Sequence, residues 1–297
     1  MVTVKPLHVL ILLALAALVL TLNQKFATGQ SVYPLPPPSS QLSIVNYPEK
    51  VKESLKNVIG ITADIYPKNN NLTTIFGYGQ KTAGTGLMFE PGIFISARHI
   101  LMSGINSFGR LAGTLLFDRH GIPSSSNLNY SIIGTTDVGR KTRDIKLNLV
   151  GMGTVYKFED YMVLRSYNYP PELKPIERDE KMLDIDKVIY NAGYVHTFEY
   201  LETDPSYSPV LFDIIRTSYT GSVDAIIKDL PVNKLGVSFL YRIKIKFEQG
   251  FSGGPILNSE GKLVAITVWG SYNYLYAIPI KDIRLFIEKL KKDDIIK

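Results

Sequence analysis

The sequence predicts an all-β fold, and three observations carry that prediction. The chain is rich in tyrosine, isoleucine and valine, with 18 tyrosines and 13 phenylalanines, and these residue types favour strands. Short apolar runs recur between turns rich in glycine, proline and asparagine. The length of 297 residues and the 45% hydrophobic content are enough for one large or two small domains with a substantial core.

The N-terminal segment predicts export. Residues 7–22 are almost wholly apolar and follow Lys5, but this run of 16 residues is shorter than the ~20 of a comfortable membrane span. Ala27-Thr28-Gly29 supplies small residues for signal cleavage. Residues 1–29 are therefore a signal peptide or a membrane anchor. Both alternatives place the rest of the chain outside the cytoplasm, either secreted or anchored through residues 7–22.

Residues 30–46 form a linker, and residues 47–297 form the folded domain. The run Pro34-Leu35-Pro36-Pro37-Pro38 cannot build a core and behaves as a stiff, extended spacer. After it the pattern predicts a short helix over residues 47–56 and a strand over residues 57–65.

Charge and composition exclude several classes of function. The net charge is +6, yet no block of lysine or arginine stands out and no nucleic-acid motif is present, so no nucleic-acid partner is expected. The absence of cysteine excludes disulfides and cysteine-ligated metals. We expect neither a metal nor a cofactor.

One loop carries the signature of nucleophilic catalysis. Residues 249–255, Gln-Gly-Phe-Ser-Gly-Gly-Pro, follow a strand pattern over residues 241–247. Glycines around Ser252 permit a tight turn that exposes its Oγ and aims backbone N–H groups at a developing oxyanion. An ordinary flexible loop is the competing interpretation.

A serine needs a base, and the order of residues limits the choice. The loop also fits the G-x-S-x-G elbow of α/β-hydrolases, but that fold requires a histidine after the serine, and none follows Ser252. The four histidines are His8, His99, His120 and His196. His99 is favoured because it stands just past a strand–turn–strand pattern over residues 84–95.

These segments together resemble trypsin-like serine proteases, specifically the Deg/HtrA branch. The resemblance spans residues 47–292. It rests on three motifs: Gly84-Thr85-Gly86 with the hairpin before His99, the run Asp160-Tyr-Met-Val-Leu-Arg, and the serine loop. In addition, residues 261–266 and 276–279 are similar to the family's closing strands.

The resemblance implies two six-stranded antiparallel β-barrels, at about residues 47–168 and 180–280. Within the second, residues 211–217 and 222–227 predict a hairpin about Tyr219-Thr220-Gly221, and after it the apolar positions of residues 281–292 predict an amphipathic helix. Residues 102–158 are longer than a minimal domain of this type needs, which suggests an insertion. No PDZ-like segment follows the helix, so regulation through such a domain is not expected.

The resemblance also implies the roles of the site residues. Ser252 would attack, His99 would act as base and Asp160 would orient His99, with Asp144 and Glu159 as rival acids. The N–H groups of Gly250 and Ser252 would form the oxyanion hole. Val268, Trp269 and Gly270 would pair with the substrate backbone, and the alternative for Trp269 is a place in the core.

Two residues depart from the family pattern. Phe251 stands where the family has asparagine, and its bulk puts the resting geometry of the loop in question. Arg98 stands before His99, where asparagine or alanine is common, and we expect it to be solvated.

The predicted function is a serine endopeptidase that hydrolyses polypeptides and takes part in protein quality control. The alternative is a catalytically weak homologue that binds extended or unfolded chains as a scaffold. Both use polypeptide partners, and both contact a membrane if the N-terminal segment is retained. The oligomeric state stays open, with a homo-oligomer as one alternative because Deg-type proteases are often trimers.

Overall fold

The computed structural model describes residues 47–68, 80–138, 141–154, 159–199, 210–228, 237–271 and 273–296. The predicted signal or anchor, residues 1–29, and the linker, residues 30–46, lie outside these ranges. Within them, no helix combines the length and the apolar character needed to cross a membrane.

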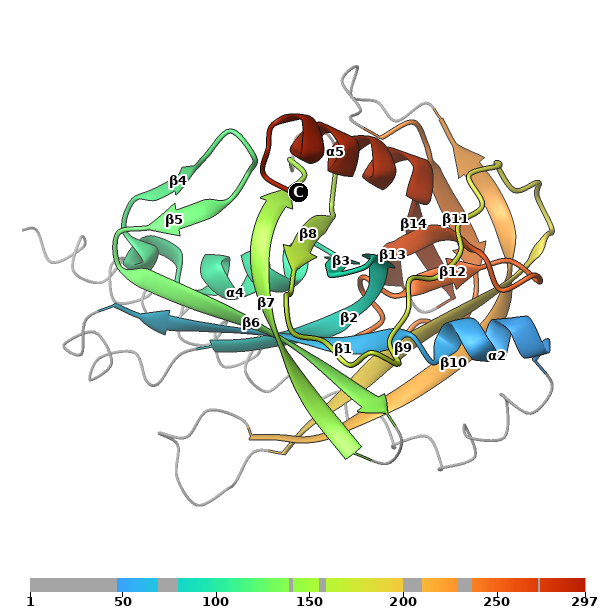
Figure 1. Ribbon diagram of the computed structural model, residues 1–297, viewed down its shortest axis with the longest axis horizontal. Coiled ribbons are helices and arrows are strands. Elements are labelled where there is room, and N and C mark those ends of the chain that lie inside the picture. Colours follow the sequence, from blue (N-terminus) through green and yellow to red (C-terminus); the bar gives the residue numbers. More distant parts are fainter. Residues whose placement is uncertain are drawn as a thin grey trace, which may run out of the picture. The chain divides into compact units, whose positions relative to one another are not determined.

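Six antiparallel strands close into a first barrel (Figure 1). Around this barrel the order is β1 (Val58–Pro67), β2 (Gln80–Glu90), β3 (Ile93–Ser96), β8 (Met162–Arg165), β7 (Lys141–Met152) and β6 (Leu128–Val138). β6 pairs with β1 along most of their length, which closes the barrel and leaves no free edge.

A second closed barrel follows, again of six antiparallel strands. Its order is β10 (Val210–Ile227), β11 (Leu240–Lys244), β14 (Tyr274–Pro279), β13 (Leu263–Ser271), β12 (Pro255–Leu257) and β9 (Val188–Glu199). The chain ends in helix α5 (Ile280–Lys292). The predicted all-β class, the double barrel and the C-terminal helix are confirmed.

The remaining elements lie outside the two barrels. These are α2 (Glu49–Leu55), α4 (His99–Ser107), the 3-10 turn η2 (Gly109–Ala112) and a two-stranded sheet of β4 (Leu115–Phe117) and β5 (Pro123–Ser125). The small sheet belongs to the stretch in which the sequence suggests an insertion. In Figure 1 it extends beside α5.

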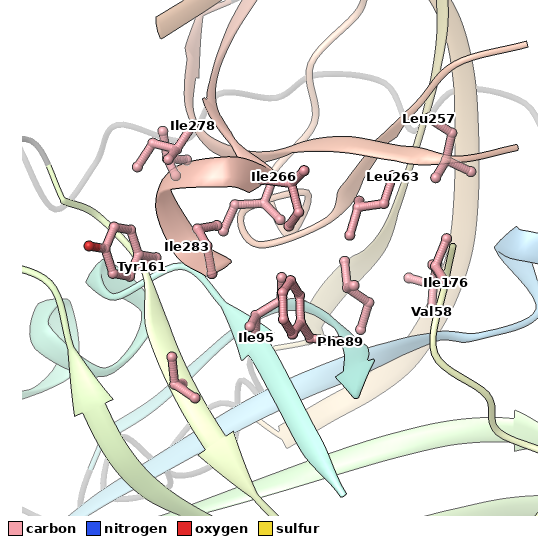
Figure 2. Packing of buried hydrophobic residues seen from close by; sticks show 14 of the residues in the cluster. Val58, Phe89, Ile95, Tyr161, Ile176, Leu257, Leu263, Ile266, Ile278 and Ile283 are labelled. Atoms are coloured by element: carbon pink, nitrogen blue, oxygen red, sulfur yellow. The ribbon is translucent and has the colours of Figure 1, made fainter. Parts of the chain in front are cut away.

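Three clusters of buried apolar side chains hold the domain together. One fills the first barrel and one fills the second. The third lies between the barrels and joins residues of β1–β3, such as Phe89 and Ile95, to residues of β13, β14 and α5, such as Ile266 and Ile283 (Figure 2). Because this shared cluster excludes water from both barrels, it fixes one barrel against the other.

Strand β10 corrects one prediction. The sequence around Tyr219-Thr220-Gly221 predicts a turn between two strands, but the structure has one continuous strand there. Gly221 pairs with Ile189 of β9, and a methyl group in its place would lie 2.6 Å from the carbonyl oxygen of Lys244. The glycine therefore marks a close approach of the neighbouring strand rather than a turn.

Candidate active site

The pairing of two short strands brings Asp160 to His99. β3 and β8 are antiparallel, and Ser96 at the end of β3 pairs with Met162 at the start of β8. Residues just after β3 and just before β8 must therefore lie together. His99, the first residue of α4, donates its backbone N–H to Asp160 Oδ1 at 2.8 Å.

The three side chains form one continuous hydrogen-bonded line. His99 Nδ1 lies 2.6 Å from Asp160 Oδ2, and His99 Nε2 lies 2.8 Å from Ser252 Oγ. The backbone N–H that reaches Oδ1 fixes the carboxylate in the plane where its second oxygen meets Nδ1. Ser252 is only 7% exposed, whereas the His99 side chain is 39% exposed, so the imidazole faces the cleft.

The rival acids lie elsewhere. Asp144 belongs to β7, where its Oδ1 accepts a hydrogen bond from Thr135 at 3.3 Å. Glu159 Oε2 accepts hydrogen bonds from the backbone and hydroxyl of Thr154. Of the other histidines, His120 is buried beside Asp293, while His8 and the side chain of His196 lie outside the described part of the chain.

The serine loop depends on glycine at two points. Gly250 has φ 99° and Gly253 has φ 84°, conformations that residues with a Cβ rarely adopt. A methyl group on Gly253 would lie 2.1 Å from the carbonyl oxygen of Thr85. Among the described residues, the N–H groups of Gly250 and Ser252 have no acceptor.

Thr85, which the sequence did not single out as a site residue, holds this loop from the other barrel. It lies on β2 and is fully buried. Its hydroxyl donates to the carbonyl of Gly250 at 2.5 Å and accepts the N–H of Tyr194 at 2.9 Å, and its N–H donates to the carbonyl of Ser252 at 2.8 Å. Its position between two glycines in Gly84-Thr85-Gly86 is the sequence signal that could have identified it.

Phe251 is the internal anchor of the loop. Its side chain is fully buried, and its ring lies 5.5 Å from that of Tyr219. It packs directly on Gly193, where a methyl group would lie 2.3 Å from the ring. Tyr219 donates its hydroxyl to Glu248, whose carbonyl accepts the N–H of Phe251 at 3.3 Å. Burial and the bond to Glu248 raise the pKa of Tyr219 to about 12.

An open cleft of about 610 Å³ contains the three aligned side chains. Val268, Trp269 and Gly270 line the same cleft, and Trp269 is 63% exposed, so it does not belong to the core. The pairing of β13 with β12 ends at Ile266, so these three residues of β13 lie beyond it. Their backbone on the β12 side of the strand faces the cleft that contains Ser252.

No group of three or more histidine, cysteine, aspartate or glutamate side chains suited to a metal occurs among the residues that the structure describes.

No family model matches the sequence, and no curated protein matches it. Among solved structures, the active form of the Rv3671c protease from M. tuberculosis aligns with a TM-score of 0.51 at 14% identity, covering 86% of this chain and 87% of that one. The inactive form of a serine-to-alanine Rv3671c mutant aligns at 0.50 and 15% identity, covering 87% and 95%. Deg5 aligns at 0.49 and 15% identity, covering 80% and 90%. The two closed barrels and the two Rv3671c alignments at TM-scores of 0.51 and 0.50 show that the chain has the trypsin-like double-barrel fold.

Proposed function

We propose that this protein is a serine endopeptidase in which Ser252, His99 and Asp160 form the catalytic triad. The observation that carries the proposal is the line of hydrogen bonds from Asp160 through His99 to Ser252, at 2.6 and 2.8 Å. A nucleophile, a base and an orienting acid in this order are what acyl transfer through an activated serine requires.

The proposed reaction begins at the serine. Ser252 Oγ attacks the carbonyl carbon of a peptide bond while His99 Nε2 accepts the hydroxyl proton. The imidazolium that forms is stabilised by Asp160, which accepts a hydrogen bond from Nδ1–H and stays ionised. His99 then donates the proton to the leaving amine, an acyl-serine remains, and water activated by the same base releases the second product.

The oxyanion of the tetrahedral intermediate binds the N–H groups of Gly250 and Ser252. Two features support this assignment. The positive φ of Gly250 shapes the loop, and the hydroxyl of Thr85 donates a hydrogen bond to the carbonyl of Gly250. Hydrogen bonds that await the developing charge stabilise the transition state more than the substrate.

The substrate binds as an added strand. Among the described residues, no strand pairs with residues 268–270 on the side of the cleft, and β-augmentation of an extended peptide there places a scissile bond beside Ser252. The occupant of the cleft is therefore a polypeptide rather than a small ester. Action outside the cytoplasm, in the quality control of exported proteins, is proposed from the apolar residues 7–22.

The test is hydrolysis of unfolded casein by the full chain. We expect cleavage by the parent and no cleavage by the Ser252→Ala variant. Ser103→Ala is the matched control, because Ser103 lines the same cleft without a base and its loss should leave the rate unchanged. The scaffold alternative predicts that casein binds to the parent and to Ser252→Ala equally and that neither cleaves it.

A further inference from the structure

A second cavity, of about 740 Å³, lies between α4, the region of the β4–β5 sheet and α5. Its wall combines charged and polar side chains with an apolar group made of Met102 of α4, Leu115 and Phe117 of β4, and Leu285 and Phe286 of α5. Phe117 and Leu285 are about half exposed, at 48% each, so the cavity has an apolar rim open to solvent. This volume is typical of small-molecule sites, about 300–1,000 Å³.

Arg98 provides the one buried cation of this wall among the described residues. Contrary to the solvated side chain expected from the sequence, Arg98 is only 8% exposed, and its Nε has no hydrogen-bond partner within the described part of the chain. Burial lowers the pKa of Arg98, and the nearby charge of Asp160 opposes that change. A buried guanidinium N–H without a hydrogen-bond acceptor is costly, and a bound anion would offset that cost.

The acids in the wall of the cavity do not supply the anion that Arg98 lacks. Asp118, Glu159 and Asp282 line the cavity, but each already accepts two hydrogen bonds from neighbouring backbone N–H or hydroxyl groups. Among the other cations, Arg119 donates its Nε to His120, and Lys289 is exposed to water. Arg98 is thus the buried charge for which a ligand would supply the missing partner.

We propose that this cavity binds an amphiphilic monocarboxylate, with the carboxylate on Arg98 and an aliphatic chain along Phe117 and Leu285. A planar guanidinium matches the two oxygens of a carboxylate. The three acids in the wall repel a doubly charged group, which argues against a phosphate monoester. The apolar rim favours an aliphatic chain on the ligand, because contact between the rim and that aliphatic chain removes the apolar surface of both from water.

Binding in this cavity acts on the triad, a consequence that rests on the proposed function. Arg98 precedes His99, and its backbone N–H lies 3.4 Å from the carbonyl oxygen of Asp160. Its positive charge opposes the imidazolium that His99 forms during the reaction. A carboxylate paired with Arg98 weakens that repulsion, so we expect a higher kcat with an unchanged KM.

The binding test uses decanoate as the probe and the full chain carrying Ser252→Ala, so that binding is measured without turnover. Calorimetric titration below the micelle concentration should show one saturable site. Arg98→Met should weaken binding about tenfold or more, as expected for loss of a charge-assisted bond. Leu285→Glu, at an exposed position that folding tolerates, should weaken it similarly. Lys289→Met is the control and should change the affinity by less than about threefold.

Decanol, which has the same chain and no charge, should bind about tenfold more weakly or worse. Equal binding of decanol and decanoate, or a decanoate affinity unaffected by Leu285→Glu, would overturn the proposed site. In the parent chain, a kcat that does not rise with saturating decanoate would overturn the coupling to the triad. A parent chain without any peptidase activity would refute the proposed function and leave the calorimetric result standing.

Discussion

Asp160 makes two hydrogen bonds to the same histidine, one to its backbone N–H and one to its ring. This arrangement fixes both the position of His99 and the tautomer in which Nε2 is free to accept the proton of Ser252. The carboxylate therefore acts on the serine through the imidazole, without touching the substrate.

Asp160→Asn should lower kcat about 10⁴-fold, the size of effect that this substitution has in the general triad mechanism. An amide can present its NH₂ group to Nδ1 and so favour the wrong tautomer. Single-turnover kinetics on a peptide ester measures the effect, with Asp144→Asn as the control on β7. A loss of less than tenfold would mean that another group orients His99.

The sequence predicted Asp160, His99 and Ser252 as one group because each stands beside a strand with a recognisable pattern, and the structure brings their side chains together. Thr85 and Arg98 could not be assigned in the same way. The contacts of Thr85 join β2 to a loop and a strand of the other barrel, at sequence separations of 165 and 109 residues. Arg98 shares its cavity with residues of β4 and α5, neither of which adjoins it in sequence.

Thr85→Val should lower kcat by on the order of tenfold to a hundredfold and leave KM nearly unchanged. Valine has the same shape but removes the hydroxyl that donates to the carbonyl of Gly250, and loss of such a buried hydrogen bond costs about 1–3 kcal/mol. Peptide hydrolysis measures the rate. An unchanged kcat would show that the oxyanion loop keeps its shape without this contact.

At the scale of the elements, β10 stabilises the catalytic loop through Tyr219. The ring of Tyr219 contacts Phe251, and its hydroxyl bonds to Glu248 and accepts from Lys246 at 3.1 Å. In the second barrel the sequence predicted residues 241–247 as a strand from their pattern and residues 261–266 and 276–279 by resemblance. It divided β10 at Gly221, because local patterns do not distinguish a turn glycine from one that permits close strand packing.

Tyr219 should make the stability of the fold sensitive to alkaline pH. Its pKa is raised from 10.0 to about 12, so the folded chain holds a proton that the unfolded chain has lost within this window. Stability therefore falls as the pH rises from 10 to about 12. Urea unfolding at pH values below and within this window should show that the free energy of unfolding falls less for Tyr219→Phe than for the parent. An equal loss in both would assign the effect to other groups.

Over the whole molecule, the cluster between the barrels supports the hydrogen-bonded line from Asp160 to Ser252. His99 and Asp160 belong to the first barrel and Ser252 to the second, so this packing, together with the hydrogen bonds of Thr85, holds Nε2 2.8 Å from Oγ. The sequence predicted two barrels by resemblance, but not this shared core, because its members alternate with residues that fill the barrels themselves.

Leu263→Ala should destabilise the domain by about 2–5 kcal/mol, since Leu263 is fully buried in the shared cluster and its loss leaves a cavity. Leu116→Ala is the control at a position that is 61% exposed, where the expected change is within about 0.5 kcal/mol. Urea unfolding should remain a single transition in the parent. Two separate transitions would contradict a core shared by both barrels.

The most direct measurement is fluorophosphonate labelling of the full chain, beside His99→Ala and Ser252→Ala. These reagents bond covalently to a serine that a neighbouring base has activated. The parent should be labelled at Ser252, and both variants should stay unlabelled, because one lacks the base and the other the nucleophile. An unlabelled parent, or labelling that persists without His99, would contradict the triad.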